Sequence, residues 1–270
     1  MNLTSPSQVK AWCIENDFHP NKTLGQNFLI DRNALVAIVD AGLEGVRPDA
    51  DGVVRVLEIG PGLGVLTEEL LARGCEVTAV EKDPPLAARL ADALGNPPKL
   101  AVVEADALDW LAGSDVRFSC MVSNLPYQAG TRILLELVQG REPAAMTVLV
   151  QTEVAERLAA GPGSKTRSLA GVWAQLDYDV RIVRKVAASC FWPRPEIGSS
   201  VVRLTRHERA ASLSVPERDI FHRLTKQAFE HRRKQLGSIF KDMIQSTARA
   251  EELSNEDWLT LVRELARAGD

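Results

Sequence analysis

Apolar and polar positions follow two distinct rhythms through the first two thirds of this chain. Short runs rich in β-branched residues, such as V-V-R-V-L-E-I at 53–59, are typical of buried strands. Longer segments with apolar residues three or four positions apart, such as 32–42 after the cap residue Asp31, are typical of helices. The predicted strands are 53–59, 75–81, 100–104, 118–123, 146–151, 179–187 and 199–205. The predicted helices among them are 32–42, 63–73, 84–94, 130–139, 152–160 and 168–177.

This order of elements predicts an α/β fold. Helices that alternate with strands favour an open, mostly parallel, Rossmann-like central sheet with helices on both faces. After about residue 208 the pattern becomes wholly helical, with predicted helices at 216–230, 232–244 and 255–268. We therefore expect two domains, an α/β domain at 1–207 and a small all-helical domain at 208–270. In sheets of this kind, ligands bind at the carboxyl ends of the strands.

Composition narrows the class of protein. The 270 residues are 45% hydrophobic and 25% charged, which is ordinary for a globular protein. No apolar stretch approaches the roughly 18 residues of a membrane span, and the first ten residues lack the basic and apolar blocks of a signal peptide. The four cysteines lie far apart, with no C-x-x-C pair. We expect a cytoplasmic protein with reduced cysteines, no metal site and no membrane partner.

The net charge is −4, but the charge is unevenly spread. Between residues 203 and 249, eleven basic side chains stand against five acidic ones. The residues after 249 return to an acidic balance. A basic zone in an acidic protein fits either a face that binds a polyanion or an ordinary solvated helix surface, and charge alone does not decide between them.

A glycine-rich stretch, E-I-G-P-G-L-G at 58–64, follows the first predicted strand and opens a helix. Glycine lets the backbone turn sharply and approach a ligand closely. Val65 stands where a dinucleotide fingerprint has its last glycine. The spacing therefore favours a nucleoside-type ligand over a pyrophosphate.

Two carboxylates stand at the next strand ends. Glu81 ends the second predicted strand, where a carboxylate can accept two hydrogen bonds from a ribose diol. Asp106 follows the third, where a carboxylate can accept from an adenine amino group. Either acid alone is more often a helix cap or a solvated charge. Together with the glycines, three features at successive strand ends predict a site for S-adenosylmethionine.

The fourth predicted strand ends in N-L-P-Y at 124–127. Beside a methyl donor, these groups can engage the exocyclic amine of adenine, whose lone pair is delocalised into the ring. The Asn124 side-chain oxygen and the backbone carbonyl of Leu125 or Pro126 can accept from its hydrogens and favour a tetrahedral nitrogen. Tyr127 can stack on a flipped-out base. An isolated N-x-P-Y would be only a turn, but its place beside the other strand ends favours catalysis.

Seven segments resemble one protein family, the ribosomal RNA adenine dimethyltransferases of the small-subunit, kasugamycin-resistance type. They are K-T-L-G-Q-N-F-L (22–29), E-I-G-P-G-L-G-V-L-T (58–67), A-V-E-K-D (79–83), E-A-D-A-L (104–108), N-L-P-Y (124–127), F-W-P-R-P-E-I-G-S-S-V-V-R-L (191–204) and A-F-E-H-R-R-K-Q-L (228–236). The resemblance implies a Rossmann-like methyltransferase domain followed by a helical RNA-binding domain. It implies dimethylation, with S-adenosylmethionine, of two adjacent adenosines near the 3′ end of small-subunit rRNA during ribosome biogenesis. We also expect a monomer.

The resemblance implies roles for particular residues. The expected cofactor-binding residues are Asn27, Leu29, Gly60, Gly62, Glu81, Asp106 and Asn124. The expected catalytic residues are Asn124, Leu125, Pro126, Tyr127 and Phe191. Among them, Phe191 would hold the target base from the face opposite Tyr127. The residues expected to meet RNA phosphates are Arg232, Arg233 and Lys234.

The chain departs from the family pattern in three places. Q-A-G-T follows N-L-P-Y where the family usually has a polar N-I-S-like stretch, T-R-S-L-A-G follows Lys165, and Gly198 stands where an acid is common. These departures leave the predicted cofactor site intact and concern loops that engage RNA.

The sequence leaves two other functions open. A large-subunit rRNA adenine methyltransferase of the antibiotic-resistance type shares N-x-P-Y chemistry, although its glycine loop usually lacks the P-G-L-G form of 61–64. A non-catalytic ribosome-assembly or transcription factor could use the same scaffold. Such relatives tend to lose cofactor or motif residues, and all of these are present here.

Overall fold

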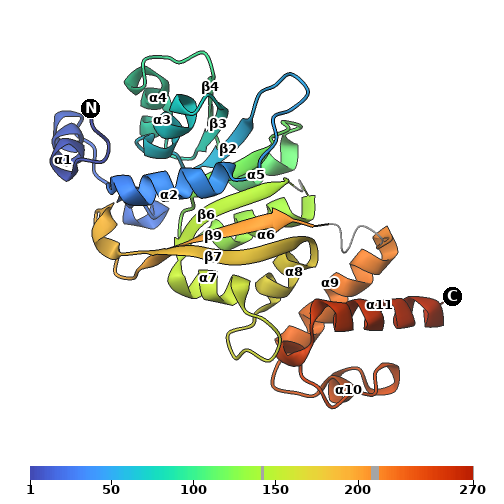
Figure 1. Cartoon of the computed structure of the whole chain (residues 1–270). Helices are drawn as coiled ribbons and strands as arrows, with labels where there is room; N and C mark the ends of the chain where they lie inside the picture. Colours follow the sequence, from blue (N-terminus) through green and yellow to red (C-terminus); the bar gives the residue numbers. More distant parts are fainter. Residues whose placement is uncertain (141–142, 208–212, 270) are drawn as a thin grey trace. The chain divides into compact units, whose positions relative to one another are not determined.

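A seven-stranded sheet forms the centre of the computed structural model, which describes residues 1–140, 143–207 and 213–269 (Figure 1). The strands, in the spatial order β4-β3-β2-β5-β6-β9-β7, are Leu100–Glu104, Glu76–Glu81, Arg55–Ile59, Cys120–Asn124, Ala145–Gln151, Ser199–Arg206 and Tyr178–Val186. The first five are parallel to their neighbours, and β9 runs antiparallel to β6. The prediction of an α/β fold with a mostly parallel sheet is confirmed.

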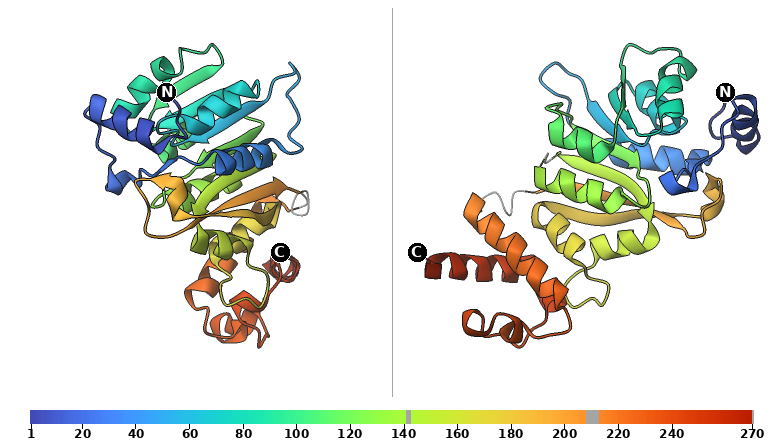
Figure 2. Two further views of the ribbon diagram at one scale, coloured as in Figure 1. Left: turned by 60° about the vertical axis from the view of Figure 1, so that its left-hand side comes forward. Right: turned by 180° about the vertical axis from the view of Figure 1, so that it is seen from behind.

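Helices lie on both faces of this sheet. They are α2 (Arg32–Leu43), α3 (Val65–Ala72), α4 (Pro84–Ala93), α5 (Ala107–Gly113), α6 (Gly130–Gly140) and α7 (Thr152–Ala159). In Figure 1, α2 lies in front of the sheet, and in the view from behind in Figure 2, α6 lies in front. All of these helices except α5 begin close to their predicted positions. The Asp31 carboxylate accepts from the Ala34 N–H at 2.7 Å and caps α2, as the sequence predicted.

The main core lies between α2, α3 and the sheet. Ile38 and Val39 of α2 and Leu70 of α3 are fully buried, and they pack with β-branched residues such as Val122 of β5. Strands covered on both faces need apolar side chains in both directions, which explains the continuous apolar runs in the sequence. This packing fixes the strand ends where the predicted site residues stand.

The N-terminal segment holds elements that the sequence pattern did not predict. They are the helix α1 (Pro6–Glu15), the short 3-10 turn η1 (Lys22–Leu24) and the strand β1 (Phe28–Leu29). β1 pairs with β8 (Phe191–Trp192), which follows the 3-10 turn η2 (Ala188–Cys190). Another helix that was not predicted, α5, begins at the Asp106 cap.

The chain divides into two compact units. The first comprises residues 1–155 and 181–205, and the second comprises 156–180 and 206–270. The second unit contains α8 (Leu169–Asp177), α9 (Val215–Glu230), α10 (Leu236–Ile239), η3 (Lys241–Met243), η4 (Ala250–Glu252) and α11 (Asn255–Gly269). Its own core is built around Phe221 and Trp258, both fully buried. This division assigns 156–180 to the helical unit, whereas the predicted boundary at 207/208 adjoins residues 208–212, which lie outside the described residues.

The predicted helix at 232–244 is wrong. Only Leu236–Ile239 is α-helical there, and residues 231–235 form a turn and an isolated bridge from Gln235 to Arg249. The Gly237 N–H donates to the Ser246 carbonyl at 2.9 Å, so the backbone pairs with a distant segment instead of continuing as a helix.

Candidate active site

The glycine-rich turn lies between β2 and α3 and has the conformation that the sequence predicted. Gly60, Gly62 and Gly64 have φ values of +69°, +58° and +90°, a region that side-chain-bearing residues rarely adopt. A side chain at Gly62 would also meet the ring of Phe28 at 3.0 Å. Without side chains at Gly60 and Gly62, the backbone of this turn directly lines the cavity described below.

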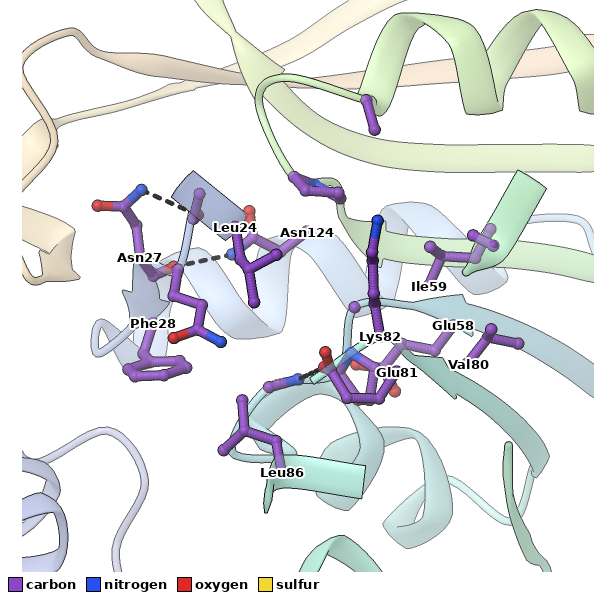
Figure 3. Close-up of a pocket in the computed structure, with 18 of the residues that line it drawn as sticks. Leu24, Asn27, Phe28, Glu58, Ile59, Val80, Glu81, Lys82, Leu86 and Asn124 are labelled. Atoms are coloured by element: carbon purple, nitrogen blue, oxygen red, sulfur yellow. Dashed lines mark hydrogen bonds between the residues drawn. The ribbon is translucent and has the colours of Figure 1, made fainter. Parts of the chain in front are cut away.

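Glu81 ends β3 beside this turn. Its carboxylate accepts from the backbone N–H of Gly62 at 3.0 Å and from that of Asp83 at 2.9 Å. The side chain is 7% exposed, and burial raises the pKa of Glu81 while the two backbone donors oppose the rise. Glu81 thus connects the glycine turn to the start of α4, with its carboxylate in the pocket (Figure 3).

Asp106 follows β4 and has two partners. Its Oδ1 accepts from the Leu108 N–H at 2.9 Å, and its Oδ2 accepts from Lys82 Nζ at 2.7 Å. The Lys82 ammonium, the larger cause, and the backbone donor together hold the pKa of Asp106 below its usual value. Lys82 was not predicted as a site residue, although Lys82 directly follows Glu81 in the sequence.

Asn124 ends β5 and meets the N-terminal segment. Its Nδ2 donates to the Asn27 carbonyl at 3.1 Å, and the Asn27 side chain donates to the Gly25 carbonyl at the same distance (Figure 3). This bond uses the nitrogen of the Asn124 amide and leaves its Oδ1 without a partner among the described residues. The buried Ser123 hydroxyl accepts from the Ile59 N–H at 2.8 Å, which holds the ends of β5 and β2 together.

The carbonyls of Leu125 and Pro126, the two predicted acceptors for an adenine amine, differ in their hydrogen bonds. The Pro126 carbonyl accepts from the Gly130 N–H at 2.8 Å and from the Ala129 N–H at 3.2 Å, so it anchors the start of α6. The Leu125 carbonyl accepts no hydrogen bond within the described residues. Of the two, Leu125 is therefore the better placed to accept from a ligand.

Three sequence segments meet at this turn. A Cβ added at Gly60 would lie 3.7 Å from Pro126 Cδ, and one added at Gly25 would lie 3.3 Å from the Tyr127 nitrogen. The glycine turn, the N-L-P-Y turn and the K-T-L-G-Q-N-F-L segment are therefore neighbours in the fold.

The two predicted aromatic residues lie apart from the pocket. The Tyr127 hydroxyl shares a 2.7 Å hydrogen bond with the Ser199 hydroxyl, and burial raises the Tyr127 pKa. Phe191 is 2% exposed and packs in the main core, paired across β1 and β8 with Leu29, itself 1% exposed. Neither aromatic ring is among the described residues that line the pocket, whereas Leu29 is. The base-stacking roles of both rings stay predictions.

The predicted cofactor-binding residues all line one cavity. Its walls come from 23–29, 58–63, 80–82 and 105–107, together with Asn124 and Pro126 from the N-L-P-Y turn. Glycine backbone, a buried carboxylate and a rim carboxylate lie along successive strand ends, an arrangement that can accept hydrogen bonds from an adenosine-type ligand. The cavity also contains Glu58, a buried carboxyl group that the sequence analysis did not single out.

The three basic residues of the second unit differ in their surroundings. Arg232 donates to the Lys165 carbonyl at 3.0 Å and lies 3.6 Å from the Glu251 carboxylate. Arg233 and Lys234 are exposed, and their side chains have no ion pair or hydrogen bond within the described residues. The structure therefore gives Arg232 an internal partner and leaves the other two facing solvent.

The described part of the chain contains neither a candidate metal cluster nor a membrane-spanning helix. In those residues, no cluster of three or more histidine, cysteine, aspartate or glutamate side chains is arranged to hold a metal ion. Within the same ranges, no helix has the length and apolar character needed to cross a bilayer.

Comparison with known proteins gives a family match over most of the chain. The family model described as ribosomal RNA adenine dimethylase matches residues 17–267. The ribosomal RNA small subunit methyltransferase A of Shouchella clausii is 38% identical over 259 residues, which cover 92% of this chain and 83% of that protein.

Solved structures share the fold. A dimethyladenosine transferase from Plasmodium falciparum superposes with a TM-score of 0.75 at 23% identity, covering 89% of this chain and 98% of that one. The 23S rRNA methyltransferase ErmE superposes with a TM-score of 0.68 at 26% identity, covering 89% of this chain and 100% of that one. These similarities confirm the Rossmann-like architecture.

Proposed function

The chain belongs to the ribosomal RNA adenine dimethylase family, and we propose that it dimethylates the N6 amines of two adjacent adenosines near the 3′ end of small-subunit rRNA. The small-subunit assignment is supported by the name of the Shouchella clausii relative and by other relatives that carry the same name at 32–43% identity. The observation that carries the proposal is the convergence of Gly60, Glu81, Asn27 and Asn124 on one cavity.

S-adenosylmethionine is the proposed cofactor. It supplies a methyl group on a positively charged sulfur. The Glu81 carboxylate would accept from the ribose hydroxyls, and the backbone at Gly60 and Gly62 would let the ligand approach closely. Asp106 would accept from the adenine amine, while Asn27 and Leu29 would contact the methionine end. All these residues line the same cavity, which supports the assignment.

The target amine is proposed to lie at the N-L-P-Y turn. Asn124 Oδ1 and the Leu125 carbonyl, both without partners among the described residues, would accept from its two hydrogens. Such preorganised acceptors favour the tetrahedral nitrogen that is needed for methyl transfer. After one methylation a single N–H remains, so one acceptor suffices for the second. The displaced proton passes to solvent, and no strong base is required.

The second unit is proposed to bind RNA through exposed basic residues. Arg233 and Lys234 face solvent and would contact phosphates, while Arg232 would hold the turn that presents them. We propose that the protein acts as a monomer in the cytoplasm.

The test is methylation of small ribosomal subunits that lack the modification, followed by mass spectrometry of the nucleosides. We expect dimethyladenosine at two adjacent positions with the wild-type protein and almost none with Asn124→Ala. Methylation of large-subunit RNA alone would instead indicate the antibiotic-resistance activity. Cofactor binding or its absence, measured by calorimetry, would separate an enzyme with another substrate from a non-catalytic assembly factor.

A further inference from the structure

Glu58 is a buried acid in the proposed cofactor cavity that has no role in the scheme above. It lies near the carboxyl end of β2, is 1% exposed, and lines the cavity beside Glu81 (Figure 3). Its Oε2 accepts from the hydroxyl of Thr67, a fully buried residue of α3, at 2.7 Å. No lysine, arginine or histidine in the described part of the chain forms an ion pair with it.

The surroundings of Glu58 disfavour its charge in the empty protein. Glu81 is also buried, but its carboxylate accepts from the backbone N–H groups of Gly62 and Asp83. The donors to Glu58 both belong to one residue, the hydroxyl and the backbone N–H of Thr67. The charged neighbour that acts on Glu58 is Glu81, and like charge disfavours ionisation. The remaining charges of the cavity, Lys82 and Asp106, pair with each other. Burial, the largest cause, raises the pKa of Glu58 to about 8.

We propose that Glu58 selects the charged cofactor: it is protonated in the empty cavity, releases its proton to solvent when S-adenosylmethionine binds, and disfavours the neutral product S-adenosylhomocysteine. This inference rests on the proposed function. The two ligands differ by one methyl group and one positive charge. In a buried site a positive charge favours an ionised carboxylate strongly, because water screens it little. A carboxylate at Glu58 therefore contributes more to binding the methyl donor than to binding the product.

The direction of the pH dependence follows from this assignment. Binding requires the ionised form, so affinity for S-adenosylmethionine rises with pH until the pKa of the empty protein is passed. We expect roughly a tenfold rise between about pH 6 and pH 7, flattening above about pH 8, because one proton is linked to binding. Affinity for S-adenosylhomocysteine should change much less across this range.

The experiment is titration calorimetry of both ligands in phosphate and in Tris at equal pH. The dependence of the binding heat on buffer ionisation heat counts the protons released. The cofactor's α-amino group also titrates in this range. The number of protons released by Glu58 is therefore the difference between the proton counts of wild type and Glu58→Gln. At about pH 7 we expect wild type to release nearly one proton more than the variant.

Glu58→Gln should also weaken S-adenosylmethionine binding about 10- to 100-fold above pH 8, the usual effect of losing one charge-assisted interaction. Its affinity for S-adenosylhomocysteine should change less than about threefold. The matched control is Glu69→Gln. Glu69 is a buried acid of α3 that pairs with Arg32 and Arg73 and lies outside the cavity, so its proton count should equal that of wild type.

Equal proton counts in wild type and Glu58→Gln would overturn the inference and leave the proposed function intact. Failure of wild type to bind S-adenosylmethionine would overturn both. If Glu58→Gln does not fold, Thr67→Val is the deciding variant, because it removes the hydroxyl that favours the ionised carboxylate and keeps the backbone N–H of residue 67. The pH midpoint of S-adenosylmethionine binding should then rise, and an unchanged midpoint would refute the role of Glu58.

Discussion

The Asn124 amide is held by a hydrogen bond from its nitrogen, and its oxygen can still accept from a ligand. Its nitrogen donates to the Asn27 carbonyl, which fixes the orientation of the amide and turns Oδ1 away from that bond. We expect Asn124→Ala to lower the single-turnover methylation rate about 100- to 1,000-fold, because one preorganised polar group is lost from the transition state. Cofactor affinity, measured by calorimetry, should stay within a few-fold of wild type.

The control for this prediction is Asn33→Ala, an exposed position near the start of α2, outside the cavity. It should methylate at the wild-type rate. A wild-type rate in Asn124→Ala as well would show that the amide only joins β5 to the N-terminal segment.

Strand β3 offers a matched pair of glutamates, one at each end. Glu81 lies in the cavity, and Glu76 lies at the opposite end of the strand, 3.3 Å from Arg55. We expect Glu81→Gln to weaken S-adenosylmethionine binding about 10- to 100-fold, because charge-assisted hydrogen bonds to the ribose are lost. Glu76→Gln should bind normally in the same calorimetric titration. Equal affinities for the two variants would refute the ribose assignment.

At the residue scale, the sequence could indicate which side chains share the cavity. Parallel strands bring their carboxyl ends to one edge, so Gly60, Glu81 and Asn124 could be placed together from strand order alone. Side-chain pairing could not be predicted in the same way. The hydrogen bond from Lys82 to Asp106 depends on the paths of the loops that follow β3 and β4. The burial of Phe191 depends on the pairing of β1 with β8.

At the scale of elements, locally specified segments were predicted and segments held by distant contacts were not. The helix α2 has a cap and an apolar face within its own twelve residues. In contrast, β1 is two residues long and exists because it pairs with β8, more than 160 residues later. A pattern read over a short window contains no information about such a partner.

The segment 232–244 was predicted as one helix, although only Leu236–Ile239 is α-helical. Leu236, Phe240 and Ile244 are buried and four residues apart, which is helical spacing. The chain turns back instead, because the Leu236 N–H pairs with Ala248 and the Gly237 N–H pairs with Ser246. A Cβ at Gly237 would lie 2.9 Å from the Ser246 carbonyl oxygen, so glycine is required for this close approach.

The turn at 231–235 gives its basic residues different expected effects. Arg233→Ala with Lys234→Ala should weaken binding to small-subunit RNA and make the dependence of log affinity on log salt shallower by about two, because roughly one counterion is released per phosphate contact. Arg232→Ala should mainly lower the unfolding midpoint, because it loses the Lys165 carbonyl and the Glu251 carboxylate as partners. Filter binding across a salt series and thermal unfolding measure these effects.

A matched control is Arg263→Ala, an exposed basic position on α11 outside the turn. For this variant, the dependence of log RNA affinity on log salt should equal that of wild type. An unchanged slope in the Arg233 and Lys234 double variant would show that these two residues form only a solvated surface.

At the scale of the whole molecule, the chain contains two separate hydrophobic cores. Ile38 lies in the first, between α2 and the sheet, and Phe221 lies in the second, among the helices of the second unit. Both side chains are fully buried. The proposed cofactor cavity is lined only by residues of the first unit, and the exposed basic turn belongs to the second. The residues proposed to bind the cofactor and those proposed to bind RNA thus belong to units with separate cores.

This division predicts two thermal transitions in scanning calorimetry. S-adenosylmethionine at about 100 times its Kd should stabilise only the first unit, by about 2.7 kcal/mol, because a ligand stabilises the part that binds it. Ile38→Val should lower the same transition by about 0.5–1.5 kcal/mol. Phe221→Leu leaves a cavity at a fully buried site and should lower only the other transition, by about 0.5–3 kcal/mol. It should leave the cofactor-induced shift unchanged. A single transition that moves with the cofactor and with both substitutions would show that the two cores unfold together, and the proposed domains would not be independent folding units.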